Sequence, residues 1–306
     1  MNKSIIAAFA AASVLFGHAV LANPDLTPQK HGQYYKSEQL FIFDTENARG
    51  GKGTMHGEFA FRREQARPQD AIIEIGWMTL KPGAYIGGHA HEGNEDAYII
   101  FSGKGISTDG NNNAWVVKPG DMIIARAGQS HSLANLFNEN LVFIRVIAKN
   151  DATKKMTSDQ DAGGSTIRET YPWLFSGQVD HTKQYYRSDE LLEHNIENFH
   201  NGSGMAFGKY AFYHDAAKPG EAFKEIGIMT LKTGASIGTH LHKDDENAYI
   251  FLSGEGVFTD GSGQEMPVTP MTITITGPNQ SHALRNDKEH DLVFITVNAK
   301  NQHAGM

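Results

Sequence analysis

The stretch from Gly83 to Gly103 reads GAYIGGHAHEGNEDAYIIFSG, and it returns 151 residues later, from Gly234 to Gly254, as GASIGTHLHKDDENAYIFLSG. The match extends without gaps on both sides: by direct count, about 54 of the 118 positions in 33–150 are identical in 184–301. This period is far longer than the roughly 20–50 residues of solenoid repeats. The chain is therefore a tandem duplication of a whole domain.

Each repeat carries the pattern of short β-strands. Apolar runs such as 121–124 and 141–146 are separated by turn-forming pairs such as Asp109-Gly110 and Pro119-Gly120. Short strands at this spacing favour a sandwich or a closed barrel over βαβ units. We expect an all-β protein with one barrel over 31–150, a linker over 151–181 and a second barrel over 182–301.

The composition narrows the classes of function. The 306 residues carry a formal net charge of −8, which argues against a nucleic-acid partner because phosphate binding needs a basic surface. A mean hydropathy of −0.42 excludes a multi-span membrane protein. The absence of cysteine removes disulfides and thiolate metal sites. The fifteen histidines are therefore the strongest metal ligands that the chain offers.

The first 22 residues have the pattern of a secretory signal. Lys3 precedes an apolar run over 5–16, and small residues lead to Ala22, after which we expect cleavage. The run of about 12 residues is short of the roughly 20 that a membrane-spanning helix needs. An uncleaved anchor is the alternative. The prediction is a periplasmic or secreted protein with no membrane association beyond the signal peptide.

Three histidines in each repeat have the spacing of a metal site. His89 and His91 are two residues apart, so on a strand both side chains point to one face. His131 follows on a later strand that an antiparallel neighbour could bring back beside the pair. Three imidazoles and one carboxylate suit a divalent Fe, Mn, Ni, Zn or Co ion, with positions open for water or substrate. The second repeat offers His240, His242 and His282.

The carboxylate ligand is left open between two neighbouring positions. Glu95 and Asp96 are adjacent in the first repeat, where the second repeat has Glu246 and Asn247. Because a strand alternates its faces, both members of a pair cannot point inward unless a bulge intervenes. Spacing to Gly103 favours Asp96, whereas the presence of a carboxylate in both repeats favours the two glutamates. With Asp96 as the ligand, the second site has three histidines and an amide, and holds metal more weakly.

These residues also carry a resemblance to a known family. The stretch 83–103 resembles the first signature motif of the cupins, and 120–135 resembles the second; both recur in the second repeat. The second motif departs from the pattern where Arg126 replaces a proline and where Met271 and Asn279 replace glycines. The chain is similar to a bicupin. The resemblance implies a double-stranded β-helix, or jelly roll, of six to eight strands per domain, with a metal in the mouth of each barrel.

The resemblance implies metal chemistry on a small molecule without identifying the reaction. Bicupins include dioxygenases, decarboxylases, isomerases and lyases that act on small oxygen-rich substrates, and we favour such an enzyme. One alternative is a non-catalytic periplasmic cupin that binds a sugar or a small acid; another is a chain with one catalytic and one structural barrel. No catalytic residue is indicated by the sequence. The oligomeric state is left open, since cupin barrels often pair.

Overall fold

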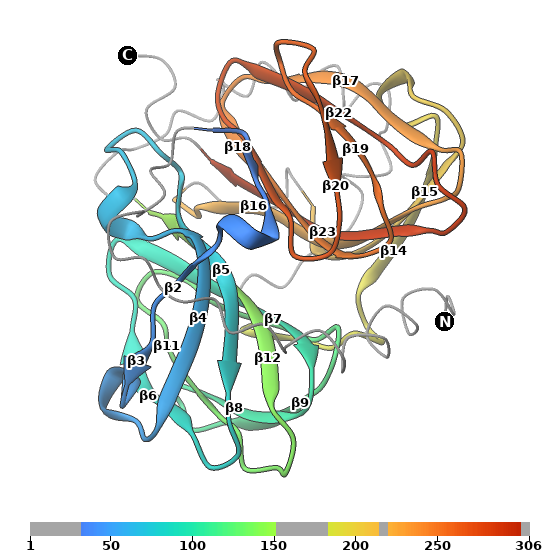
Figure 1. Ribbon diagram of the computed structural model, residues 1–306. Helices are drawn as coiled ribbons and strands as arrows, with labels where there is room; N and C mark the ends of the chain where they lie inside the picture. Colours follow the sequence, from blue (N-terminus) through green and yellow to red (C-terminus); the bar gives the residue numbers. More distant parts are fainter. Residues whose placement is uncertain (1–31, 151–182, 214–219, 301–306) are drawn as a thin grey trace.

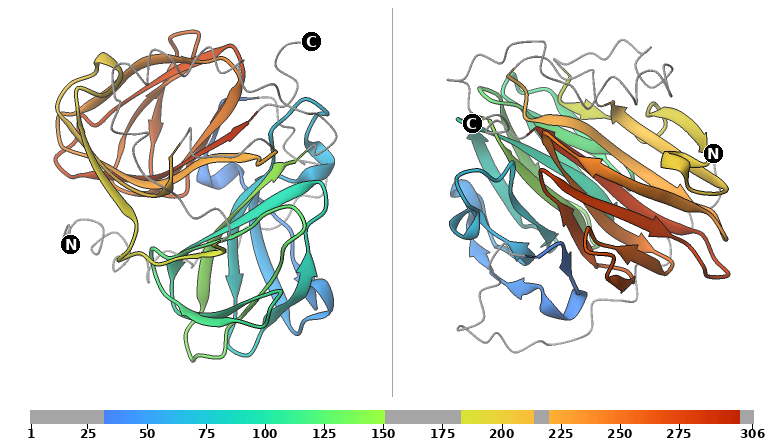
Figure 2. Two further views of the ribbon diagram at one scale, coloured as in Figure 1. Left: turned by 180° about the vertical axis from the view of Figure 1, so that it is seen from behind. Right: turned by 90° about the horizontal axis from the view of Figure 1, so that it is seen from above.

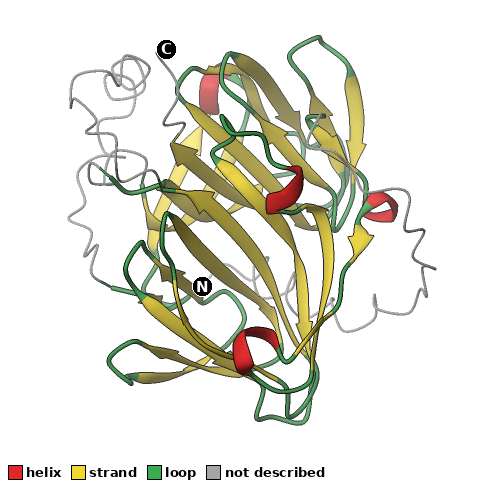
Figure 3. Cartoon of the chain, turned by 90° about the vertical axis from the view of Figure 1, so that its left-hand side faces the viewer, coloured by secondary structure: helices red, strands yellow, loops and turns green. Residues whose placement is uncertain are grey.

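The computed structural model describes residues 32–150, 183–213 and 220–300. Within these ranges the chain is built from β-strands, and its helices are single 3-10 turns (Figure 3). No helix of the described residues is long and apolar enough to cross a membrane. The expected signal peptide and the expected linker lie outside the described residues.

The first repeat folds into a barrel of two sheets (Figure 1). The smaller sheet has the order β6-β11-β8-β9, and the larger one has the order β13-β10-β7-β12-β5-β4-β2, with β3 paired to β4. Strand β13 (Tyr185–Tyr186) comes from the second repeat. The strands of this repeat are β2 (Phe41–Ile42), β3 (Thr45–Glu46), β4 (Thr54–Phe61), β5 (Ile72–Leu80), β6 (Tyr85–Ala90), β7 (Asn94–Ser102), β8 (Gly105–Asp109), β9 (Ala114–Val117), β10 (Met122–Ala125), β11 (Ser130–Ala134) and β12 (Leu141–Lys149).

The second repeat forms the same kind of barrel. Its sheets have the orders β17-β22-β19-β20 and β1-β21-β18-β23-β16-β15-β14, where β1 (Tyr34–Tyr35) comes from the first repeat. The expected all-β fold with two jelly-roll barrels is confirmed. The strands are β14 (Leu192–Glu197), β15 (Met205–Phe212), β16 (Phe223–Leu231), β17 (Ser236–His242), β18 (Asp245–Ser253), β19 (Gly256–Thr259), β20 (Glu265–Val268), β21 (Ile273–Thr276), β22 (Gln280–Arg285) and β23 (Leu292–Lys300).

The two barrels exchange their entry strands. Strand β1 (Tyr34–Tyr35), from the start of the first repeat, pairs with β21 of the second barrel. Strand β13 (Tyr185–Tyr186), from the start of the second repeat, pairs with β10 of the first. The Tyr185 hydroxyl also donates a 2.7 Å hydrogen bond to Asp121 of the first barrel. Each large sheet is therefore completed by a strand from the other half of the sequence.

The large sheets of the two barrels pack against each other (Figure 2). Along β7, Ala97 and Ile99 belong to a core cluster that contains residues of both repeats, whereas Tyr98 and Ile100 point into the first barrel. This alternation is the period-2 rule for a strand that is buried on both faces. The interface between the barrels is thus a hydrophobic core, and burial of its apolar surface stabilises the pair as one unit.

The turns before β21 and β22 keep their shape without glycine. Gly120 and Gly128 have φ values of 87° and 83°, and their counterparts Met271 and Asn279 adopt 69° and 60°. Left-handed backbone is uncommon for residues other than glycine, most of all for a bulky side chain such as that of Met271. The substitutions that interrupt the second cupin motif therefore strain these two turns but leave their conformations in place.

The shared core predicts cooperative unfolding of both barrels. Ile144 and its counterpart Ile295 are fully buried in the shared cluster. We expect Ile144→Ala and Ile295→Ala each to lower the free energy of unfolding by about 2–5 kcal/mol. Calorimetry should show one transition that shifts in both variants, whereas Leu136→Ala, at a 64% exposed side chain, should change little. Two separate transitions, only one of which moves in each variant, would contradict this expectation.

Candidate metal centres

Strands from both sheets of the first barrel bring the first candidate centre together. His89 lies on β6, and it pairs directly with His131 on the neighbouring β11. His91 follows the end of β6, and Asp96 lies on β7, which is in the other sheet between β10 and β12. The four side chains therefore meet between the two sheets of the barrel, and ligand atoms of all four lie within 4.8 Å of one another.

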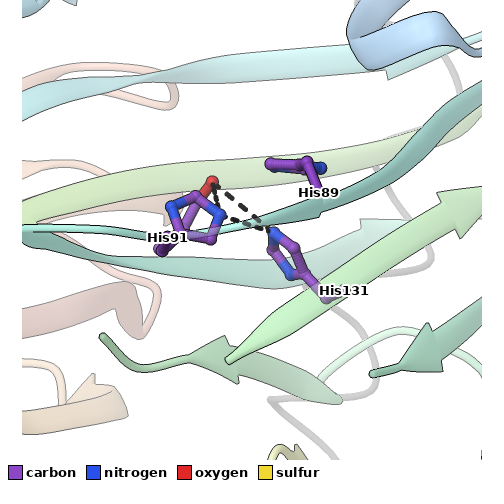
Figure 4. Close-up of side chains that lie close together, drawn as sticks. His89, His91 and His131 are labelled. Carbon is purple, nitrogen blue, oxygen red and sulfur yellow. Dashed lines mark hydrogen bonds and ion pairs between the residues drawn. The ribbon is translucent and has the colours of Figure 1, made fainter. Parts of the chain in front are cut away.

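The imidazole rings point toward one another (Figure 4). The Nε2 atoms of His91 and His131 are 3.0 Å apart. Asp96 Oδ2 lies 3.5 Å from His91 Nε2 and 3.8 Å from His131 Nε2. His89 Nε2 is buried, with no hydrogen-bond partner in the structure.

The hydrogen bonds on the outer side of the rings fix their tautomers. His89 Nδ1 lies 2.9 Å from the carbonyl oxygen of Gly87, and His91 Nδ1 lies 2.8 Å from Asn94 Oδ1. Both partners are acceptors, so each Nδ1 carries the proton and each Nε2 presents a lone pair to the centre. Metal-binding histidines have this arrangement. The residues present therefore fit a cation.

The electrostatics of the cluster also favour a cation. Burial lowers the pKa of His89 to about 4 and that of His131 to about 3, so both rings are neutral at neutral pH. Burial opposes the charge of Asp96, but the guanidinium of Arg145 outweighs it and holds the carboxyl pKa below its usual value. Arg145 donates to both oxygens of Asp96 at 2.9–3.2 Å and pairs with Glu74 at 2.9 Å.

The second barrel repeats the three histidines but changes their surroundings. His282 Nε2 lies 2.9 Å from His240 Nε2 and 3.2 Å from His242 Nε2. Gly238 accepts from His240 Nδ1, as Gly87 does from His89. The carboxylate of Asp245 lies 2.9 Å from His242 Nδ1, at the place that Asn94 has in the first barrel.

Glu95 and Glu246, the alternative ligands in the sequence, lie outside the two clusters, and this corrects the expectation that favoured them. Glu95 accepts hydrogen bonds from the backbone N–H groups of Ala222 and Phe223, in the second barrel, at 2.9 and 3.2 Å. In the mirrored contact, Glu246 accepts from Ile72 of the first barrel at 3.0 Å. Both glutamates therefore face the interface between the barrels, and their inward neighbours are Asp96 and Asn247.

Sequence reasoning missed Arg145 and His200. Arg145 lies on β12, opposite Tyr98, and only the pairing of β7 with β12 shows that it reaches Asp96. His200 stacks on His240 with a centroid distance of 3.8 Å and an interplanar angle of 5°. A Cβ on Gly238 would lie 2.1 Å from the His200 carbonyl oxygen, so glycine is needed for this close approach. The exposed Arg49 is the counterpart of His200 in the first repeat.

The placement of the two neighbouring acids predicts separate effects of their removal. Glu95→Ala leaves buried Arg126 and two backbone donors without their carboxylate, so we expect a loss of about 3–5 kcal/mol in the free energy of unfolding. The affinity of the Glu95→Ala variant for a divalent ion should not change. Asp96→Asn takes a carboxylate from buried Arg145, which keeps Glu74 as a partner, so it should also lower stability. Unlike Glu95→Ala, it should lower the affinity for a divalent ion at least tenfold, as measured by metal titration and urea unfolding. A loss of metal affinity in Glu95→Ala but not in Asp96→Asn would instead identify Glu95 as the ligand.

The buried histidines predict how the stability of the metal-free protein depends on pH. The unfolded chain takes up protons on these rings below about pH 6.5, whereas folded His89 and His131 resist protonation down to about 4 and 3. The free energy of unfolding should therefore fall as the pH is lowered through this window, by up to about 1.4 kcal/mol per pH unit for each ring. His89→Gln should flatten this dependence in urea titrations.

His56→Gln is the matched control for this measurement. His56 is a partly exposed histidine whose pKa is raised by hydrogen bonds to Glu58 and Asp44, against the opposing effect of its partial burial. Its protonation stabilises the folded state below pH 6.5, and this contribution is lost as the pH rises. Removing it should steepen the loss of stability at acidic pH. An unchanged pH dependence in His89→Gln would contradict the assignment of buried neutral rings.

Comparisons with known proteins agree with this geometry. The family model of the cupin domain matches residues 76–147 and 227–298. An oxalate-binding protein of Thermotoga maritima is 32% identical over 116 residues, which are 38% of this chain and 93% of the relative. Among solved structures, an oxalate decarboxylase of Lactobacillus farciminis in a formate complex superposes with a TM-score of 0.59 at 13% identity, covering 94% of this chain and 89% of the other.

A variant of the oxalate decarboxylase of Bacillus subtilis gives a TM-score of 0.59 at 14% identity, covering 94% of this chain and 80% of the other. At these identities the two decarboxylases show a shared fold alone. The family follows from the cupin domain in each repeat and from the relative matched over nearly its whole length: this chain belongs to the cupins, and it is a bicupin.

Proposed function

We propose that this protein is an exported, metal-dependent bicupin enzyme that binds a small dicarboxylate of the oxalate class at the first centre and cleaves it. The observation that carries the proposal is the convergence of His89, His91, Asp96 and His131 on one point. The name of the oxalate-binding relative supports the choice of ligand. Fe, Mn, Ni, Zn and Co remain the candidate ions, and a divalent ion held there supplies a Lewis acid for a carboxylate oxygen.

The charges around the first centre suit an anionic ligand. Arg145 is held by Asp96 and Glu74. Arg63 Nε lies 3.7 Å from Glu74 Oε2, and the Arg63 side chain is 32% exposed. Its charge acts on His91, where it opposes ring protonation. This partly exposed guanidinium can pair with a carboxylate that enters the barrel, and its planar fork matches carboxylate geometry.

A second arginine, Arg49, belongs to a turn that packs close to the first centre. Arg49 lies in the 3-10 turn η3 (Ala48–Gly50), and its carbonyl oxygen would be 2.2 Å from a Cβ on Gly87. The turn therefore lies against β6, two residues before His89. Arg49 and Arg63 act on each other electrostatically. The two positive charges thus favour a dianion over a neutral sugar as the ligand of the first centre.

The alternative is a protein that binds the same dicarboxylate without turnover. The name of the relative, an oxalate-binding protein, favours it. The deciding experiment supplies 13C-labelled oxalate to protein loaded with each candidate ion, with and without dioxygen. Cleavage of the carbon–carbon bond of hydrogen oxalate yields carbon dioxide and formate in equal amounts, which NMR detects. Binding by calorimetry with no labelled product would leave the binding protein, and neither binding nor product would overturn both readings.

Arg63 is predicted to contribute to ligand affinity. We expect Arg63→Gln to weaken oxalate binding by about 10- to 100-fold, since a charge-assisted hydrogen bond to the carboxylate is lost. The metal content should stay the same, because Arg63 is not among the residues that converge in the cluster. Arg285→Gln, at an arginine of the second barrel paired with Glu265, is the control and should leave affinity unchanged. Equal affinities of the two variants would exclude this role of Arg63.

A further inference from the structure

Each centre has one acid and one amide at two equivalent strand positions, but the order of the two residue types is reversed between the barrels. The strand that faces the histidines carries Asn94 and Asp96 in the first barrel, and Asp245 and Asn247 in the second. At the first position of each pair, an oxygen contacts the outer nitrogen of a histidine: Asn94 contacts His91 at 2.8 Å, and Asp245 contacts His242 at 2.9 Å. The second position lies beside the inner nitrogens in the first barrel.

Asn247 occupies the register position of Asp96. It pairs with Thr276 on β21, as Asp96 pairs with Ala125 on β10. Its Nδ2 donates to Asn298 Oδ1 at 2.9 Å and to Thr296 Oγ1 at 3.1 Å. The backbone carbonyl oxygen of Val297 lies 3.4 Å from the same Nδ2 and can only accept, which favours this orientation of the amide.

The amide oxygen of Asn247 has no partner in the structure. The residue is 3% exposed, and its Oδ1 is buried without a hydrogen bond. Leaving a buried carbonyl oxygen without a hydrogen bond destabilises the folded protein by about 1–3 kcal/mol. We therefore expect a ligand to contact this atom. A cation between the three histidines is the partner that the neighbouring side chains indicate.

The surrounding charges change together with the ligand. Thr296 stands where the first barrel has Arg145, so the loss of the Asp96 carboxylate coincides with the loss of the guanidinium that neutralises it. The negative charge moves instead to Asp245, on the far side of the His242 ring. A carboxylate that accepts the outer N–H of a histidine makes the inner nitrogen a stronger donor to metal.

Resting on the proposed metal-binding function, we propose that the second centre holds a divalent ion through His240, His242, His282 and the amide oxygen of Asn247, with Asp245 providing the balancing negative charge through His242. The two centres then differ in metal preference. The carboxylate of Asp96 suits an oxygen-preferring ion such as Mn²⁺. The second centre, which has only neutral ligands, shifts toward an ion that imidazole binds well, such as Zn²⁺.

The test measures each centre alone in the full-length chain. His89→Ala isolates the second centre, and His240→Ala isolates the first. Binding of Mn²⁺ is followed by EPR of the free ion, and Zn²⁺ is added in competition. We expect the preference for Zn²⁺ over Mn²⁺ to be at least tenfold greater at the second centre. In the His89→Ala background, Asn247→Asp should raise Mn²⁺ affinity about tenfold and reduce that preference.

Two further variants separate the ligand from its charge partner. Asn247→Ala should weaken Zn²⁺ binding about tenfold at the second centre, and Asp245→Asn should weaken it by about 10- to 100-fold. The mirrored change, Asn94→Asp in the His240→Ala background, should strengthen binding at the first centre. Thermal melting of the metal-free variants checks that each one folds.

The outcomes distinguish this inference from the proposed function. Unchanged Zn²⁺ affinity in Asn247→Ala or in Asp245→Asn overturns the inference, as does an equal preference for the two ions at both centres. A wild-type chain that binds neither Mn²⁺ nor Zn²⁺ at either centre contradicts metal binding itself. Oxalate turnover is a separate readout, and it is measured on the wild-type chain.

Discussion

Adjacent side chains on a β-strand point to opposite faces, and on β7 and β18 this constraint decides what each acid does. Asp96 faces the barrel interior and meets the histidines, whereas Glu95 faces outward and accepts backbone hydrogen bonds from the other barrel. A strand between two cores thus couples a polar cluster on one side to an interface on the other. A one-residue change of register would reverse both roles.

Much of the architecture could be predicted because it depends on local patterns. The duplication, the all-β fold and the convergence of His89 with His131 follow from self-similarity, alternation and histidine spacing. The inward position of Asp96 was indicated by its spacing to Gly103. The opposing chemical argument, that a carboxylate present in both repeats should be the ligand, failed because it ignored the backbone donors of the neighbouring barrel.

Other features depend on contacts between distant parts of the sequence. Arg145 meets Asp96 only through the pairing of β7 with β12, and His200 reaches His240 only because a turn packs against β17. The exchange of β1 and β13 has no local signature, since two-residue strands carry almost no pattern. Single-sequence reasoning identified the histidines of the site, but it could not identify the residues that set its charge.

The exchanged entry strands also bear on how such a chain can be divided. Cutting it between the repeats would remove Tyr34 and Tyr35 from the sheet of the second barrel, and Tyr185 and Tyr186 from that of the first. Each fragment would keep a strand with no sheet to join and a sheet with an open edge. Two identical single-repeat chains could complete each other's sheets by exchanging their entry strands. Fusion of two such copies into one polypeptide makes that reciprocal pairing intramolecular, and therefore independent of protein concentration.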